Sequence, residues 1–115
     1  MGLWAGSLWA TSPGGWGTPI AATLSSAGAL TISGPGIYAV TGYNNLADDL
    51  ESITGGSTGD EIILYAADTT KTITVKNNAT INIGADFALD DTYDKIRLIK
   101  QDDGDWTGGG IADNA

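Results

Sequence analysis

The sequence predicts an all-β fold: a small antiparallel β-sandwich or barrel-like domain, with an extended Gly/Trp-rich N-terminal arm and at most one short helix. Two observations predict it. Short β-branched runs recur at spacings of roughly ten residues between Gly, Asn, Asp and Pro, and several of them alternate apolar with polar side chains. A chain of 115 residues has room for one domain with a modest core.

Six segments carry the strand pattern. The alternation is clear where Ile73 and Val75 are flanked by threonines, and where Ile96 and Leu98 are separated by Arg97. Side chains on a strand point to opposite faces in turn, so each such run presents one apolar face. The expected strands are 29–33, 36–40, 61–65, 71–76, 79–83 and 95–100.

Two turns and one helix are expected between these strands. Asn77-Asn78 can adopt positive φ, which predicts a hairpin over residues 71–83. Asp103-Gly104 predicts a second tight turn, leading to Trp106.

The helical candidate is residues 46–53. Leu46, Leu50 and Ile53 would share one helical face there, and Asn45 could cap its start.

Composition excludes most catalytic chemistry. The chain has no Cys and no His, which removes disulfides, thiol nucleophiles, imidazole bases and nearly every transition-metal site. Its net charge of −9 argues against binding nucleic acid or an anionic membrane surface. We therefore expect neither nucleic acid nor a membrane as a partner.

The charges divide the chain into two parts. Residues 1–47 contain no Asp, Glu, Lys or Arg, and all charged side chains follow from Asp48 onward. The uncharged part holds all three prolines and three of the four tryptophans. We expect residues 1–28 to form an extended anchoring arm and residues 29–115 to form the β domain.

Large apolar side chains on such an arm would be an aggregation hazard if they stayed in water. They pack either on their own domain or on another protein, and aromatic anchors favour the second alternative. The expected partner-binding residues are Leu3, Trp4, Leu8, Trp9, Trp16 and Ile20.

Neither end of the chain predicts export or membrane insertion. The first ten residues are apolar but have no basic residue and are interrupted by Gly2 and Gly6, unlike a signal peptide. No apolar stretch reaches the roughly 18 residues that span a bilayer. A soluble protein made in a cytoplasm is expected.

The acidic clusters 48–51, 90–94 and 102–105 offer oxygen ligands of the kind that calcium prefers. None has the spacing of an EF-hand loop, and aspartate is common in turns. We interpret them as solvated loop charge and expect no metal and no cofactor.

Two further sites were weighed against simpler interpretations. A carboxylate pair could cleave glycosidic bonds, but a domain of this size has little room for a sugar groove, so no catalytic residue is expected. Trp106 with Tyr65 or Tyr93 could stack on a sugar ring, but Trp106 is better explained as a core residue beside the last strand.

From Leu50 to Trp106 the chain resembles a small β module that recurs in structural proteins of tailed bacteriophages, in fibres and in surface proteins of the particle. The resemblance covers about half of the chain. It is carried by Leu50, Ile53, Gly55, Gly56, Gly59, residues 62–64, 66–68 and 73–76, Asn78, residues 81–84 and 86–89, Asp94, residues 96–99, Asp103, Gly104 and Trp106.

This resemblance implies a homotrimer without enzymatic activity, located in the virion after synthesis in the host bacterial cytoplasm. The chain lacks the repeats of a fibre shaft. We therefore expect a capsid decoration (cement) protein whose arm binds the major capsid protein or another virion structural protein. The alternative is a tip or adaptor part of a tail or head fibre that binds a receptor or carbohydrate; a carbohydrate-binding domain outside any phage is a third.

Overall fold

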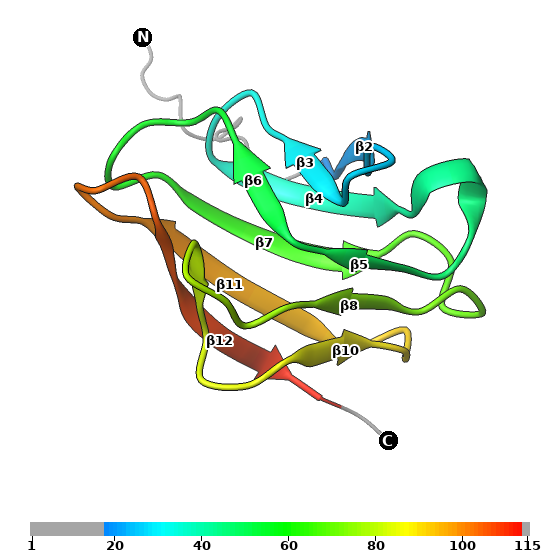
Figure 1. Cartoon of the computed structure of the whole chain (residues 1–115). Helices are drawn as coiled ribbons and strands as arrows, with labels where there is room; N and C mark the ends of the chain where they lie inside the picture. The colour runs from blue at the N-terminus through cyan, green and yellow to red at the C-terminus, as the bar shows by residue number, and fades with distance from the viewer. Residues whose placement is uncertain (1–17, 114–115) are drawn as a thin grey trace, which may run out of the picture.

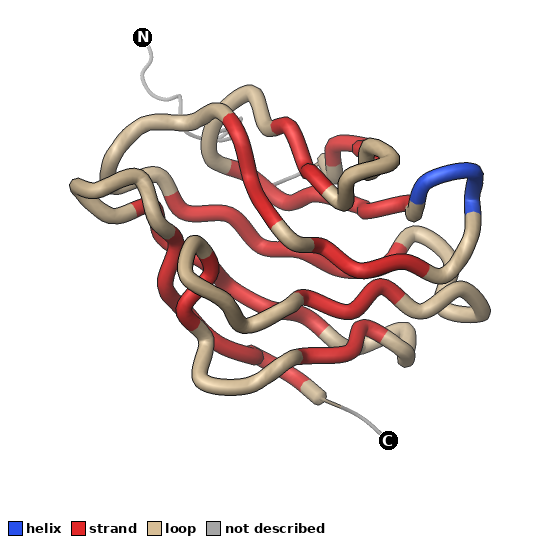
Figure 2. Tube along the Cα trace, viewed as in Figure 1, coloured by secondary structure: helices blue, strands red, loops and turns tan. Residues whose placement is uncertain are grey.

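A computed structural model of the chain describes residues 18–113, and it is almost entirely strand (Figures 1 and 2). The all-β prediction is confirmed, and a 3-10 turn, η3 (Tyr43–Asn45), is the one helical element among the described residues. The strands are β2 (Ile20–Thr23), β3 (Ala29–Thr31), β4 (Gly36–Thr41), β5 (Asp48–Leu50), β6 (Ser52–Thr54), β7 (Glu61–Ala66), β8 (Ile73–Val75), β9 (Ile81–Asn82), β10 (Phe87–Leu89), β11 (Lys95–Lys100) and β12 (Trp106–Ala112).

The strands form two layers. One is a six-stranded sheet in the order β2-β4-β7-β11-β12-β9; the other consists of the pair β3-β6 and the sheet β10-β8-β5 (Figure 1). The chain passes from one layer to the other and back, so β2, β4 and β7 pair in parallel in the first layer and β3 pairs in parallel with β6 in the second. The first half of the domain is thus a two-layered coil.

A single apolar interior lies between the layers. Strand β4 buries every second residue, including Tyr38 and Val40, and β7 and β11 do the same with Leu64 and Leu98 among others. Leu50 and the other buried side chains of the second layer pack against these residues. Each fully buried Leu or Ile side chain stabilises the fold by about 1.5–3 kcal/mol relative to its exposed state.

The expectation of antiparallel pairing is wrong for most of the strand pairs. Five of the eight pairs are parallel and three are antiparallel. Alternating side chains determine which face of a strand is buried, but they do not determine the neighbouring strand or its direction. The antiparallel pairs join β11 to β7 and β12, and β10 to β8, in the second half of the chain.

The helix expected over residues 46–53 is wrong. This segment forms β5 and β6, which pair with β8 and β3 respectively. Leu50 is fully buried whereas Leu46 is 59% exposed, so these two side chains do not share a buried face. Backbone pairing with distant strands overrides the local helical pattern.

The hairpin expected over residues 71–83 is also wrong. Strand β8 pairs with β5 and β10, whereas β9 pairs with β12. The side chain of Asn78 shapes the connection instead: its Oδ1 accepts hydrogen bonds from the amides of Thr80 (2.9 Å) and Ile81 (3.0 Å), and its Nδ2 donates to the carbonyl of Glu51 (3.0 Å).

The turn at Asp103-Gly104 is confirmed. Gly104 has φ +90°, a region that favours glycine, and the amide of Gln101 donates to the carbonyl of Asp105 at 2.7 Å. The turn joins β11 to β12 as an antiparallel pair and brings Trp106 to the start of β12.

The β domain begins earlier than expected. Strand β2 pairs with β4, and Leu24 is almost fully buried in the core. Residues 20–24, which were expected to belong to the arm, are therefore part of the β domain. The expected arm residues Leu3, Trp4, Leu8, Trp9 and Trp16 lie outside the described residues.

Replacing Asn78 with alanine should destabilise the fold by about 2 kcal/mol, because the amide donors of Thr80 and Ile81 and the carbonyl of Glu51 lose their partner. Urea unfolding measures the change. Asn82→Ala is the matched control: Asn82 is exposed on β9, and its loss should change stability by less than about 0.5 kcal/mol. Equal effects of the two substitutions would contradict this account of the connection.

Candidate functional site

The uncharged and charged parts of the sequence occupy different parts of the folded molecule. Residues 18–47 form β2, β3, β4 and η3 and carry no charged side chain. Strand β2 lies at one end of the six-stranded sheet, and β3 contacts it from the other layer. We call this part, residues 18–47, the uncharged end.

Strand β2 is an edge strand whose outer backbone groups face away from the sheet. Among the described residues, β2 pairs with β4 alone. The amide of Leu24 donates to the carbonyl of Thr41 at 2.8 Å, on the β4 side. Because successive amides along a strand alternate in direction, the amides of Ala21 and Thr23 point to the free side.

The neighbouring edge of β3 is covered by its own loop. The amide of Ser25 donates to the carbonyl of Ala29 at 3.0 Å, and the Ser25 hydroxyl accepts from the amides of Ala27 and Ala29 at 3.2 Å each. The loop between β2 and β3 therefore occupies the start of the β3 edge, while the outer side of β2 has no strand partner in the part of the chain that the structure describes.

Apolar side chains are exposed at the uncharged end. Ile20 shares the inward face of β2 with Ala22 and Leu24, but it is 37% exposed. Tyr43 and Leu46 are exposed at the corner after β4. The Asp48 carboxylate fixes this corner by accepting from the Tyr43 amide at 3.0 Å.

A second exposed apolar surface lies on the outer face of β11 and β12. Ile99 and Ile111 flank a shallow depression of about 400 Å³ whose floor is formed by the glycines 108–110. Arg97 lines it as well and forms an ion pair with Glu61 at 2.8 Å.

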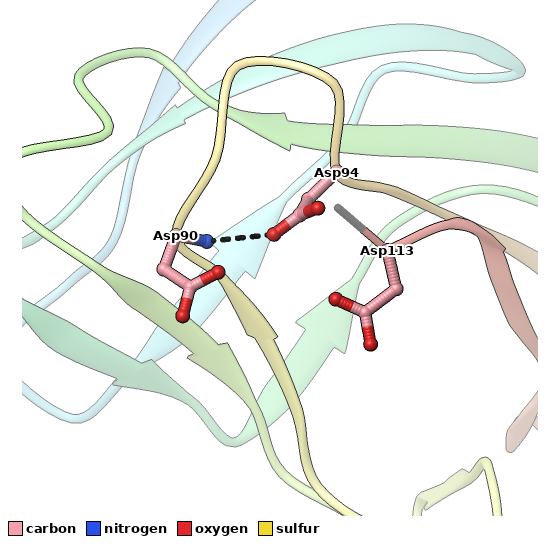
Figure 3. A group of neighbouring side chains, drawn as sticks. All are labelled: Asp90, Asp94 and Asp113. Atoms are coloured by element: carbon pink, nitrogen blue, oxygen red, sulfur yellow. Dashed lines mark hydrogen bonds between the residues drawn. The ribbon is translucent and has the colours of Figure 1, made fainter. Parts of the chain in front are cut away.

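Three carboxylates lie close together (Figure 3), next to β10 and β12 at the opposite end of the domain from β2 (Figure 1). Asp90 and Asp94 lie on the loop between β10 and β11, and Asp113 follows β12. One oxygen of each lies within 4.8 Å of the others. Asp94 is fully buried and accepts from the amide of Asp90 at 3.1 Å.

The crowding of these carboxylates affects their protonation. A hydrogen bond with the Asp94 side chain raises the pKa of Asp90, and burial and the charge of Asp94 act in the same direction. Three carboxylate oxygens could hold a hard cation, but they are fewer than the six to eight ligands that calcium takes. Within residues 18–113 this is the one such group of three or more acidic side chains.

The sequence did not predict this group. Asp90 and Asp94 are close in the sequence, but Asp113 joins them only because β11 and β12 are antiparallel neighbours. The acidic stretches 48–51 and 102–105 do not form a comparable group in the fold.

The interpretation of Trp106 as a core residue is confirmed, and the alternative of a sugar-stacking platform is wrong. Trp106 is 1% exposed, whereas Tyr93 is 66% exposed. A ring buried in the core cannot offer its face to a ligand. The indole nitrogen has no hydrogen-bond partner among the described residues.

Comparison with known proteins adds information on the fold only. No protein-family model and no curated protein matches the chain. One solved chain, from a structure of a chaperone-substrate complex, superposes on 75% of this chain with a TM-score of 0.51 and 15% identity. This chain matches only 16% of that chain's length, and the likeness shows a shared fold. None of the described residues forms a helix long and apolar enough to cross a membrane.

Replacing Asp90 with asparagine should raise the melting temperature at pH 7. A carboxyl whose folded-state pKa is raised destabilises the fold when ionised, and this cost disappears as the pH falls through that pKa. The gain of Asp90→Asn should therefore shrink as the pH approaches the ordinary pKa of aspartate. Calorimetry at several pH values measures it.

Asp91→Asn is the matched control, because it removes the same charge from the same loop outside the group of three. A gain of equal size and pH dependence in Asp91→Asn would show that general charge reduction, and not the carboxylate group, is responsible.

Proposed function

We propose that the chain is a non-enzymatic structural protein of a tailed-phage particle: a trimeric capsid decoration protein anchored by its uncharged N-terminal segment. The observation that carries the proposal is the division of one small chain into an uncharged, Trp-rich first part and an acidic β body. An apolar segment can bind a shell without desolvating ion pairs, and acidic bodies stay in solvent and repel one another.

The binding energy of the anchor would come from burial. An indole ring removes about 150–250 Å² from water, so even partial burial of Trp4, Trp9 and Trp16 contributes several kcal/mol before association costs. Ile20 is the one expected anchor residue that the structure describes, and it is partly exposed on β2. It lies where the segment would enter the β domain.

The homotrimer is proposed on two grounds. The module that the chain resembles is trimeric, and a small β domain with a free edge gains stability by burying that edge against copies of itself. The major capsid protein or another virion protein is the proposed docking partner.

Absence of catalysis is part of the proposal. The chain contains no His or Cys to act as a base or a thiol nucleophile. The most unusual acidic groups, around Asp94, surround a buried side chain rather than a substrate groove. A tip or adaptor of a fibre, bound to a receptor or carbohydrate, is the alternative role for the same β body.

Replacing Trp4, Trp9 and Trp16 together with alanine should weaken binding to the particle on the order of 100-fold, about 3 kcal/mol, while the β domain stays folded. The assay adds purified protein to particles of the encoding virus that lack it, and electron microscopy counts the occupied sites. Deletion of residues 1–17 should have the same effect. A deletion up to residue 24 would also remove β2 and the buried Leu24.

The matched control replaces Ser7, Thr11 and Ser12 with alanine, which changes the same segment and keeps the three indoles. Full occupancy by the triple tryptophan variant would contradict the anchor. Binding of the wild-type protein to tail fibres or to a glycan array, without binding to capsids, would favour the fibre role.

A further inference from the structure

We propose that the uncharged end, along the free edge of β2, is the surface through which copies of this chain bind one another. The inference rests on the homo-oligomer proposed above and names the surface that holds it together.

Strand β2 has few of the features that keep edge strands from pairing. Its sequence, Ile-Ala-Ala-Thr, has no charged residue and no proline, and its pairing with β4 is regular over residues 20–23. Natural edge strands are commonly blocked by lysine, proline or a bulge. Within residues 18–113 no strand pairs with the outward side of β2, and the amides of Ala21 and Thr23 on that side can therefore bind a strand from a neighbouring molecule.

Two other edges of the described fold are protected in part. The loop through Ser25 covers the start of the β3 edge. A register shift at Lys95/Ile96 interrupts the β11–β12 ladder, and the ring of Phe87 lies against Gly110 of β12. Strand β2 has no such protection among residues 18–113.

Charge also protects the end of the domain opposite β2. The carboxylates of Asp90 and Asp113 lie there, next to β10 and β12. Asp86, just before β10, pairs with Lys76 at 2.8 Å, and this ion pair lowers the pKa of Asp86. Two copies that met through this end would bring acidic groups together.

The same electrostatics favours a second copy at the uncharged end. Each chain carries a net charge of −9, so copies repel one another through most of their surface. Residues 18–47 carry none of this charge. The Debye length is roughly 8 Å at physiological ionic strength. Docking through this end therefore keeps most charges of the two copies too far apart to repel strongly.

Docking there would also complete the core. Ile20 is the exposed apolar residue on the inward face of β2, in line with the partly buried Ala22 and the buried Leu24. A neighbouring molecule along β2 would cover Ile20 while its backbone satisfies the outward amides. Apolar burial and backbone hydrogen bonds thus act at one place.

The test is the mass of the full-length protein by light scattering at micromolar concentration. Wild-type protein should have at least twice the chain mass of 11.7 kDa. Ala21→Lys places a charge on the free edge and should raise the concentration for half-dissociation at least tenfold. Ala21→Pro removes one outward amide without removing a hydrogen bond to β4 and should act in the same direction.

Two further lysine substitutions serve as controls. Ala85→Lys makes the same chemical change at an exposed alanine near the charged end and should leave the mass unchanged. Ile111→Lys alters the depression on β11 and β12, the competing apolar surface. Circular dichroism establishes that every variant is folded.

The outcomes separate the two proposals. A monomeric wild-type protein would overturn the oligomer of the proposed function, and this inference with it. A wild-type oligomer that persists in both folded Ala21 variants would overturn this inference alone. Dissociation by Ile111→Lys, or by deletion of residues 1–17 but not by the Ala21 variants, would place the interface elsewhere and also overturn it.

Discussion

The fold depends on one apolar interior that both layers share. Each pass of the chain contributes a short strand with one buried face, and none of these strands is long enough to be stable alone. Tyr38 on β4 combines contacts in the shared interior with a hydrogen bond to a residue close to it in the sequence. Its ring is buried between the layers, and its hydroxyl donates to the carbonyl of Gly34 at 2.6 Å and so fixes the turn before its own strand.

The coil has two ends, and the strand edges at these ends differ in how they are protected. A loop, a register shift and charged side chains protect several of the strand edges, whereas β2, the first strand of the described residues, has none of these features. The uncharged stretch of sequence coincides with this end, and we interpret the charge distribution and the free edge as features that act together. Repulsion between the acidic surfaces disfavours contact between copies except at the uncharged end.

The sequence predicted which residues are buried better than it predicted which strands are neighbours. Alternation identified the inward faces of β8 and β11, because burial acts on each strand separately. Strands β4 and β7 can pair in parallel because the chain crosses to the other layer and returns between them. No local sequence pattern predicts this crossing. A hairpin was therefore expected at Asn77-Asn78, where Asn78 instead reaches back to Glu51.

For the candidate sites too, the sequence predicted the position of single residues better than it predicted which residues lie close together. Trp106 was correctly expected in the core, since a strand residue after a tight turn has a defined inward direction. Asp113 could not be assigned to Asp90 and Asp94, because their proximity is created by the β11–β12 pairing. The free edge of β2 was not expected either, since residues 20–23 were assigned to the arm.

The central claim, that another copy covers the free edge of β2, is tested most directly by amide hydrogen exchange of Ala21 and Thr23. In the oligomer both amides should be protected, and the protection should disappear on dilution to the monomer while core amides such as that of Leu98 stay protected. Rapid exchange of Ala21 and Thr23 at every concentration, in a protein that is oligomeric at the highest, would contradict the account.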